Sequence, residues 1–240
     1  MVNLLIDAGN TSIKLAISVD GNLSSEVRCD QRELEGLVDG YLERYHKINV
    51  IAVSDVRGMD ENVYNYMERK CRRMVKVKGD MKLPIKNRYG TPATLGADRI
   101  CAAVGAHSLF PGQNCVIVDF GTAITFDFLT KEGDFLGGNI SLGLNTRFRA
   151  LNHFTGKLPL LSRVENVELV GSCTAGAMES GVILGTIFEI QGYMASFPEY
   201  NFIFTGGDAI FFAEKLKSPI FVACNLVLMG LSQIADSYAV

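Results

Sequence analysis

Two short segments of the sequence each place an aspartate, a glycine and hydroxyl side chains between apolar runs. In "LLIDAGNTSIKLAI", residues 4–17, Asp7 ends one apolar run, a polar turn over 9–12 follows, and alternating apolar residues predict a second strand. In "CVIVDFGTAITFDFL", residues 115–129, Asp119 takes the same place. The second aspartate follows the first by 112 positions in a chain of 240, which indicates two related halves.

Such turns suit one kind of chemistry in particular. Backbone N–H groups and hydroxyls that converge in a turn can hold phosphate oxygens, and an adjacent aspartate can hold Mg²⁺ directly or through water. Taken singly, each turn is better explained as a tight turn in which glycine supplies a positive φ. The repetition, together with a third glycine turn at Thr205-Gly206-Gly207, favours nucleotide binding.

The elements that must position these turns follow an α/β pattern. Each half is predicted to run strand, strand, strand, helix, strand, helix, which indicates mixed sheets covered by helices. The boundary between the halves is expected near Pro111-Gly112. Helices are expected over residues 31–45, 60–74, 94–109, 144–154, 174–197 and 226–238.

The composition predicts a globular cytoplasmic protein. Hydrophobic residues make up 48% of the chain and charged residues 20%, which is enough for packed cores. A net charge of −3 predicts no general affinity for nucleic acid or for anionic membranes. The six cysteines form no CxxC pair, so zinc and redox motifs are not expected. Neither a leader nor an uncharged apolar run of transmembrane length is found in the sequence.

The three glycine turns resemble those of the acetate and sugar kinase, Hsp70 and actin superfamily. This resemblance implies two tandem ribonuclease H-like domains, residues 1–112 and 113–240, with mixed sheets flanked by helices and a nucleotide cleft between them. The first turn would be the phosphate-1 turn, the second the phosphate-2 turn and the third the adenosine motif. The implied ATP-binding residues are Asp7, Ala8, Gly9, Asn10, Thr11, Ser12, Ile13, Lys14, Thr122, Gly206 and Gly207.

One segment narrows the resemblance to a family. "YGTPATLGADRICAA", residues 89–103, is similar to the hallmark of type III pantothenate kinases, and "DAGNTSIK", "DFGTAITFD", "GGNISLG", "GSCTAGAMESG" and "TGGDA" follow in the order of that family. The resemblance covers essentially the whole chain. Leu142 departs from it, because the family usually has proline there, which affects loop stiffness more than chemistry.

The family resemblance implies a reaction and a set of roles. The reaction is ATP-dependent phosphorylation of pantothenate to 4'-phosphopantothenate, the first step of coenzyme A biosynthesis. Asp98 would accept the proton of the alcohol, and the guanidinium of Arg99 suits the carboxylate of pantothenate. Outside this motif, helix capping with a local ion pair would explain the same two residues equally well. The implied substrate-binding residues are Tyr89, Gly96, Ala97, Asp98, Arg99 and Thr174.

The resemblance also implies cofactors and partners. ATP would come with Mg²⁺ near Asp7, and Asp119 would hold a monovalent cation, K⁺ or NH₄⁺. A homodimer is expected, with the helix in "AGAMESGVILGTIFEI" as either core or subunit interface. Neither nucleic acid nor membrane is expected as a partner.

Three other functions remain open on the sequence. The first is a non-catalytic transcription accessory factor on the same scaffold, like the Bvg accessory factors, against which the intact Asp7, Asp98, Arg99 and Asp119 argue. The second is an actin-like filament subunit, which usually carries insertions that 240 residues do not accommodate. The third is another small-molecule kinase of the superfamily, which the GADR segment disfavours.

Overall fold

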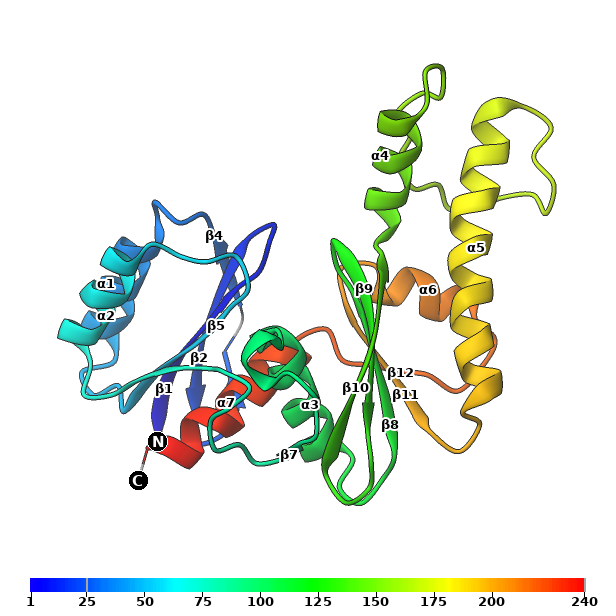
Figure 1. The fold of residues 1–240 in the computed structure, drawn as a ribbon. Helices are drawn as coiled ribbons and strands as arrows, with labels where there is room; N and C mark the ends of the chain where they lie inside the picture. Colours follow the sequence, from blue (N-terminus) through cyan, green and yellow to red (C-terminus); the bar gives the residue numbers. More distant parts are fainter. Residues whose placement is uncertain (25, 240) are drawn as a thin grey trace. The chain divides into compact units, whose positions relative to one another are not determined.

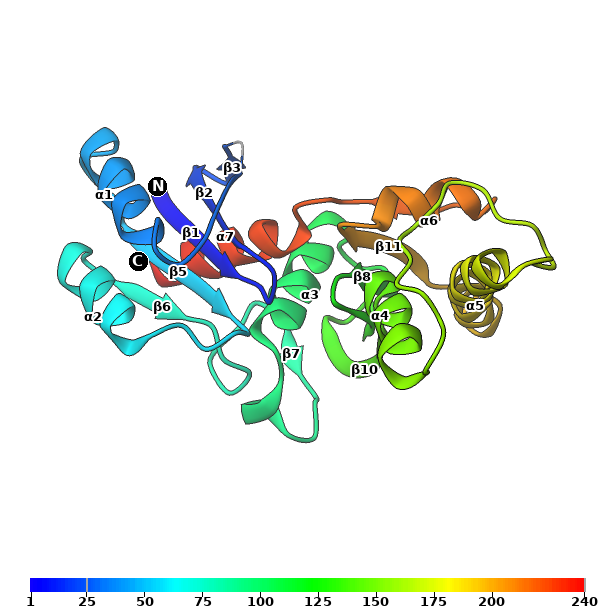
Figure 2. The same cartoon turned by 90° about the horizontal axis from the view of Figure 1, so that it is seen from above.

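The computed structural model describes residues 1–24 and 26–239 and groups them into two compact units, whose elements are labelled in Figures 1 and 2. Unit 1 contains residues 1–113, 129–137 and the chain from 225 onward. Unit 2 contains residues 114–128 and 138–224. No helix in the described part of the chain combines the length and the apolar character needed to cross a membrane.

Unit 1 is built on a mixed sheet. Its strand order is β3-β2-β1-β5-β6, and β4 also pairs with β2. The first hairpin is antiparallel, whereas β5 and β6 add in parallel because α1 and α2 return the chain between strands. The elements are β1 Val2–Ala8, β2 Ile13–Val19, β3 Asn22–Leu23, β4 Val27–Cys29, α1 Leu34–Arg44, β5 Val50–Asp55, α2 Glu61–Lys70, β6 Met74–Lys76, β7 Lys86–Asn87, η1 Pro92–Thr94, α3 Ala97–Leu109 and α7 Leu226–Tyr238.

The two faces of this sheet differ in chemistry. On β1, Leu4 and Ile6 point to a wholly apolar face, which packs in one core with side chains of α1 and α2 such as Val38 and Met67. The residues between them, Asn3, Leu5 and Asp7, point the other way, and in the strand register they pair with Ser18, Ala16 and Lys14 on β2. Contacts of α7 with β1 and β5, and of α3 with β5, cover this second, partly polar face.

Helices α3 and α7 contact each other backbone to backbone, and they lie side by side in both views (Figures 1 and 2). A Cβ on Gly230 would lie 1.7 Å from the carbonyl oxygen of Cys101, and one on Gly105 would lie 2.5 Å from that of Leu226. Only glycine allows the helices to approach this closely. The last helix of the chain therefore fixes the position of α3, whose first turn carries Asp98 and Arg99.

Unit 2 is built on a second mixed sheet, with the strand order β12-β11-β8-β9-β10. Its core gathers aromatic side chains around Phe120, whose ring centroid lies 4.9 Å from that of Phe204 and 5.0 Å from that of Phe212. The first residues of β10 belong to unit 1, where they pair in parallel with β7. The elements are β8 Cys115–Phe120, β9 Ala123–Leu129, β10 Asp134–Leu142, α4 Leu144–Phe154, α5 Thr174–Ser196, β11 Asn201–Gly206, α6 Ala209–Lys215 and β12 Phe221–Val222.

The predicted fold class, mixed sheets flanked by helices, is confirmed. Several boundaries are corrected. The helix expected over 94–109 begins at Ala97, because a 3-10 turn and an extended Leu95 precede it. The helix expected over 60–74 ends at Lys70, because Met74 already begins β6. The compact units divide the chain between 113 and 114, and α7 groups with unit 1. The domain bounds 1–112 and 113–240 stay a prediction.

Candidate active site

The first polar turn lies at the end of the β1–β2 hairpin. Its loop is closed by a hydrogen bond from the backbone N–H of Gly9 to the carbonyl oxygen of Ser12, at 3.2 Å. Asn10 and Thr11 at its tip are exposed. The carbonyl oxygen of Ala8 accepts a hydrogen bond from the N–H of Val56, which ties the turn to the loop after β5. The turn is therefore held at its base while its tip faces solvent, as a phosphate-binding turn requires.

Asp7 is a buried carboxylate just below this turn. Its side chain is 7% exposed, and in the strand register it pairs with Lys14 on β2 and Ser54 on β5. Burial raises its pKa to about 6, the nearby charge of Asp98 adds to the shift, and Lys14 and the Ser54 hydroxyl oppose it. Its Oδ1 atom is buried without a hydrogen-bond partner in the described part of the chain.

Asp98 and Arg99 lie in the first turn of α3. The backbone N–H of Arg99 donates to Oδ1 of Asp98 at 2.7 Å. Burial raises the pKa of Asp98, although this N–H and the charge of Arg99 lower it in part. A Cβ on Gly96 would lie 2.6 Å from the same oxygen, so glycine at the helix N-cap gives the carboxylate its room. The helix start thus holds a carboxylate with a raised pKa, which suits a proton acceptor.

Tyr89 completes the group of predicted residues in unit 1. The guanidinium carbon of Arg99 lies 5.6 Å from the centre of the Tyr89 ring, within the range of a cation–π contact. The ring packs on Gly137, where φ is +103° and a Cβ would come within 2.9 Å of Cδ2. The structure therefore brings Asp7, Lys14, Asp98, Arg99 and Tyr89 together, although they come from three separate segments.

The second polar turn, in unit 2, is contacted by three glycines outside it. A Cβ on Gly206, where φ is +89°, would lie 2.4 Å from Oδ1 of Asp119. The N–H of Gly207 donates to the carbonyl oxygen of Phe120 at 2.9 Å. The carbonyl oxygen of Thr122 accepts from the N–H of Gly143 at 3.0 Å and from the hydroxyl of Thr146 at 2.7 Å. Asp119, Thr122 and the adenosine motif predicted from the sequence therefore form one cluster.

Thr174 is the first residue of α5 and is exposed. It lines a cavity of about 810 Å³ whose other walls are mostly apolar, among them Leu151, Phe154, Met178 and Val182. The structure places Thr174 in unit 2, and the other predicted substrate residues in unit 1.

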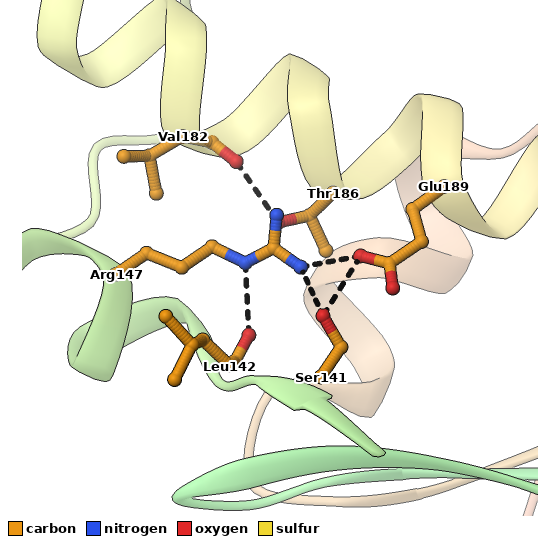
Figure 3. Close-up of polar contacts among 6 residues, drawn as sticks. All are labelled: Ser141, Leu142, Arg147, Val182, Thr186 and Glu189. Carbon is orange, nitrogen blue, oxygen red and sulfur yellow. Dashed lines mark hydrogen bonds and ion pairs between the residues drawn. The ribbon is translucent and has the colours of Figure 1, made fainter. Parts of the chain in front are cut away.

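Arg147 also lines this cavity and joins three elements around it (Figure 3). Its Nε donates to the carbonyl oxygen of Leu142 at 2.8 Å and its Nη2 to the hydroxyl of Ser141 at 2.9 Å. The same nitrogen forms an ion pair with Glu189 on α5. The segment 141–143, where the sequence departs from the family pattern at Leu142, is therefore fixed by an arginine instead of by a proline ring.

Sequence reasoning missed Ser54, Cys101, Arg147 and Glu189. Ser54 follows an apolar run as Asp7 does, so the end of β5 was a signal that strand pairing would place the two together. Cys101 is buried in α3 beside Ser54 and the carboxylates of Asp7 and Asp98. Burial raises the pKa of its thiol well above the usual range. A core cysteine carries no pattern that would have revealed this position.

The residues present fit Mg²⁺ bound together with a nucleotide. No group of three histidine, cysteine or acidic residues suited to a metal ion occurs among the described residues. Mg²⁺ is usually held by one or two carboxylates with substrate phosphates, and keeps several waters. Asp7, with an unpartnered buried oxygen and Asp98 nearby, meets that requirement, whereas a site made of protein ligands alone would not be satisfied.

The fold is that of a known structural class, as its similarity to solved structures shows. The activator of 2-hydroxyisocaproyl-CoA dehydratase from Clostridium difficile, solved with bound ADPNP, superposes with a TM-score of 0.60 at 16% identity, over 100% of this chain and 96% of that one. This is the fold shared by actin-like ATPases and sugar kinases.

Within that class, the family model of type III pantothenate kinase matches residues 3–196. The type III pantothenate kinase of Flavobacterium johnsoniae is 36% identical over 234 residues, covering 96% of both chains. That of Phocaeicola vulgatus is 40% identical over 238 residues, covering 97% of both. The chain belongs to the type III pantothenate kinase family, which confirms the resemblance drawn from its motifs.

Proposed function

We propose that this chain transfers the γ-phosphoryl group of ATP to the primary hydroxyl of pantothenate, giving 4'-phosphopantothenate, the first step of coenzyme A biosynthesis. The observation that carries the proposal is the intact GADR segment at the start of α3. It presents Asp98 and Arg99 beside the Asp7 carboxylate in a chain of this family. ATP-dependent kinases of this kind use Mg²⁺ with the nucleotide.

The roles of the residues follow from their chemistry. Asp98 orients the hydroxyl and accepts its proton as the oxygen bonds to the γ-phosphorus and the bond to ADP breaks. Arg99, with the planar fork that matches a carboxylate, binds the acid end of pantothenate. Tyr89 supports Arg99 through its ring. Gly96 and Ala97 form the helix start against which the substrate lies, and Thr174 contributes a hydroxyl.

The two turns bind the nucleotide in this proposal. Residues 7–14 hold phosphate oxygens with backbone N–H groups and the Lys14 ammonium, Thr122 contacts a phosphate, and Gly206-Gly207 lie against the adenosine. Mg²⁺, when bound at Asp7, neutralises charge on the phosphates. Asp119 holds a monovalent cation, K⁺ or NH₄⁺.

We further propose that the chain acts as a homodimer in the cytoplasm. The apolar cavity between α4 and α5, lined by Phe154 at 82% exposure, is the kind of surface that a second copy covers. Phe188, elsewhere on α5, adds a further exposed apolar side chain at 57%. Sedimentation of the purified chain tests the dimer, and Phe154→Glu should shift it toward monomer.

The decisive experiment on function is coupled release of ADP. We expect turnover with pantothenate and none above background with a panel of hexoses and N-acetylhexosamines. Turnover with a sugar instead would favour another small-molecule kinase. A folded chain that binds nucleotide but turns over none of these substrates would favour the non-catalytic accessory role.

A further inference from the structure

Ser54 and Asp7 form a pair of buried polar groups whose hydrogen bonding is incomplete. They are register partners on the parallel strands β5 and β1, so both side chains point to the face covered by α3 and α7. Ser54 is 0% exposed. Its Oγ and the Oδ1 of Asp7 are both buried, and neither makes a hydrogen bond of standard geometry in the described part of the chain. The Ser54 hydroxyl nevertheless lies close enough to the Asp7 carboxylate and the Cys101 thiol to lower the pKa of each. Cys101 on α3 closes the space beside Ser54.

A second serine on the same face shows what a structural hydroxyl looks like. Ser18 on β2 is also 0% exposed, but its Oγ lies 2.6 Å from the Oγ of Ser232 on α7, and each hydroxyl satisfies the other. A buried hydroxyl that lacks a partner costs stability. The Ser54 hydroxyl has no hydrogen bond of that quality, so its replacement by alanine should cost the fold little, and its nearest polar neighbours are the Asp7 carboxylate just below the first polar turn and the Cys101 thiol.

We propose, resting on the function proposed above, that Ser54 is a positioning residue for the Asp7 carboxylate. When Mg²⁺ is bound with the nucleotide, the Ser54 hydroxyl and Oδ1 of Asp7 would together hold one of its water molecules. Mg²⁺ keeps several of its waters when bound, and residues that hydrogen-bond to a metal's ligands fix their orientation. A serine suits this position because its hydroxyl can donate to the carboxylate and accept from the water.

The test compares Ser54→Ala with the matched control Ser18→Ala. Mn²⁺ replaces Mg²⁺ as the probe, and its binding with ADP is followed by electron paramagnetic resonance of free Mn²⁺, without pantothenate and without turnover. We expect Ser54→Ala to bind Mn²⁺ with ADP about tenfold more weakly, the size expected for one hydrogen bond to a charged site. Its melting temperature without ligand should equal or exceed that of the wild type. Ser54→Thr keeps the hydroxyl and should keep most of the affinity.

The control should show the opposite pattern. Ser18→Ala leaves the hydroxyl of Ser232 without its partner, so it should melt at a lower temperature and bind Mn²⁺ with ADP as the wild type does. If Ser54→Ala does not fold, Ser54→Cys takes its place, because it keeps the shape and offers only a weak donor.

Two results overturn the inference. Binding by Ser54→Ala, or by its substitute, within twofold of the wild type shows that the hydroxyl does not act on the ion. Equal weakening by Ser54→Thr shows that shape and not the hydroxyl matters. If the wild type itself binds no Mn²⁺ with ADP, both the proposed function and this inference are wrong. If the wild type binds Mn²⁺ with ADP and Ser54→Ala binds it equally well, only the role of Ser54 is wrong.

Discussion

Gly206 lies directly against the carboxylate of Asp119, since a Cβ on Gly206 would stand 2.4 Å from Oδ1 and 2.6 Å from the carbonyl oxygen of Phe120. Its φ of +89° is a conformation that side chains rarely adopt. We expect Gly206→Ala to lower the free energy of unfolding by roughly 1–3 kcal/mol and to displace Asp119. Urea unfolding measures this change. Gly207→Ala is the control, because its nearest contact would be at 4.0 Å, and equal stability of the two variants would contradict the expectation.

Asp7→Asn should separate stability from activity. The pKa of Asp7 is raised from 3.8 to about 6. The carboxylate of Asp7 therefore binds a proton more tightly in the folded chain than in the unfolded chain. Ionisation of Asp7 therefore lowers the free energy of unfolding. This loss is complete above pH 6 and absent below about pH 4, where the carboxyl group is protonated in both states. The variant should be more stable than the wild type above pH 6, by at most about 3 kcal/mol, with a difference that shrinks toward pH 4. ADP release should be nearly abolished. A variant less stable than the wild type at pH 8 would show that the carboxylate is structural.

Asp98→Asn and Arg99→Ala should fail in different ways. Loss of a general base costs about 10²–10⁴ in kcat with little change in KM for pantothenate. Arg99→Ala should instead raise KM for pantothenate, because a hydrogen bond to a charged group is worth roughly 1.5–3 kcal/mol. KM for ATP should change little in either variant. Since phosphoryl transfer can be largely dissociative, the loss in kcat measures positioning as well as proton transfer. A near wild-type kcat for Asp98→Asn would show that Asp98 is not the proton acceptor.

The proposal that Asp119 holds a monovalent cation predicts a specific salt response. Activity at matched ionic strength should be higher in K⁺ or NH₄⁺ than in Na⁺, and Asp119→Asn should abolish the difference. The measurement is the initial rate of ADP release in the three chlorides. Equal wild-type rates in Na⁺ and K⁺ would contradict the cation site while leaving the kinase function intact.

Asp55 should make the loop after β5 sensitive to acid. Its carboxylate accepts hydrogen bonds from the N–H groups of Arg57, Gly58 and Met59 and, at 2.5 Å, from the Tyr64 hydroxyl. Burial would raise its pKa, but these donors lower it overall. The ionised Asp55 therefore stabilises the fold at pH values above its pKa in the unfolded chain. This stabilisation is lost as the pH falls through the lower pKa that Asp55 has in the folded chain.

Asp55→Asn tests this point. It should destabilise the fold at pH 7 by roughly 1–3 kcal/mol, and by less as the solution becomes strongly acidic, measured by urea unfolding against pH. Asp60→Asn is the control, because Asp60 only caps α2 and asparagine caps equally well. A destabilisation of Asp55→Asn that does not vary with pH would contradict the role of its charge.

The sequence predicted those parts of the fold that are determined locally. The helices over 144–154 and 226–238 begin and end where their apolar periodicity indicated. The third strand expected in the first half proved to be two short strands, β3 and β4, each pairing with β2. Helix α6 was missed, because seven residues after a glycine turn give too short a pattern to detect.

The residues of the candidate site could be predicted from the sequence where they belong to a recognisable motif. Those that only tertiary packing brings to the site could not be predicted. Asp7, Asp98 and Arg99 stand in recognisable motifs. Ser54 ends an apolar run but stands in no recognisable motif, and the register of β5 with β1 is what places it beside Asp7. The glycine contact between α3 and α7 likewise depends on tertiary structure, so no pattern in either helix predicted that they pair.

The return of α7 to unit 1 has a consequence for the order in which the chain acquires structure during synthesis. Residues 226–238 leave the ribosome after every other helix and strand described, yet they cover the sheet face that holds Asp7 and contact the helix that carries Asp98. Until they emerge, that face of β1 and β5 lacks part of its cover, although its strands were the first to be made. The nascent protein therefore exposes part of this face until α7 has been made, and such exposed apolar surface is what chaperones bind.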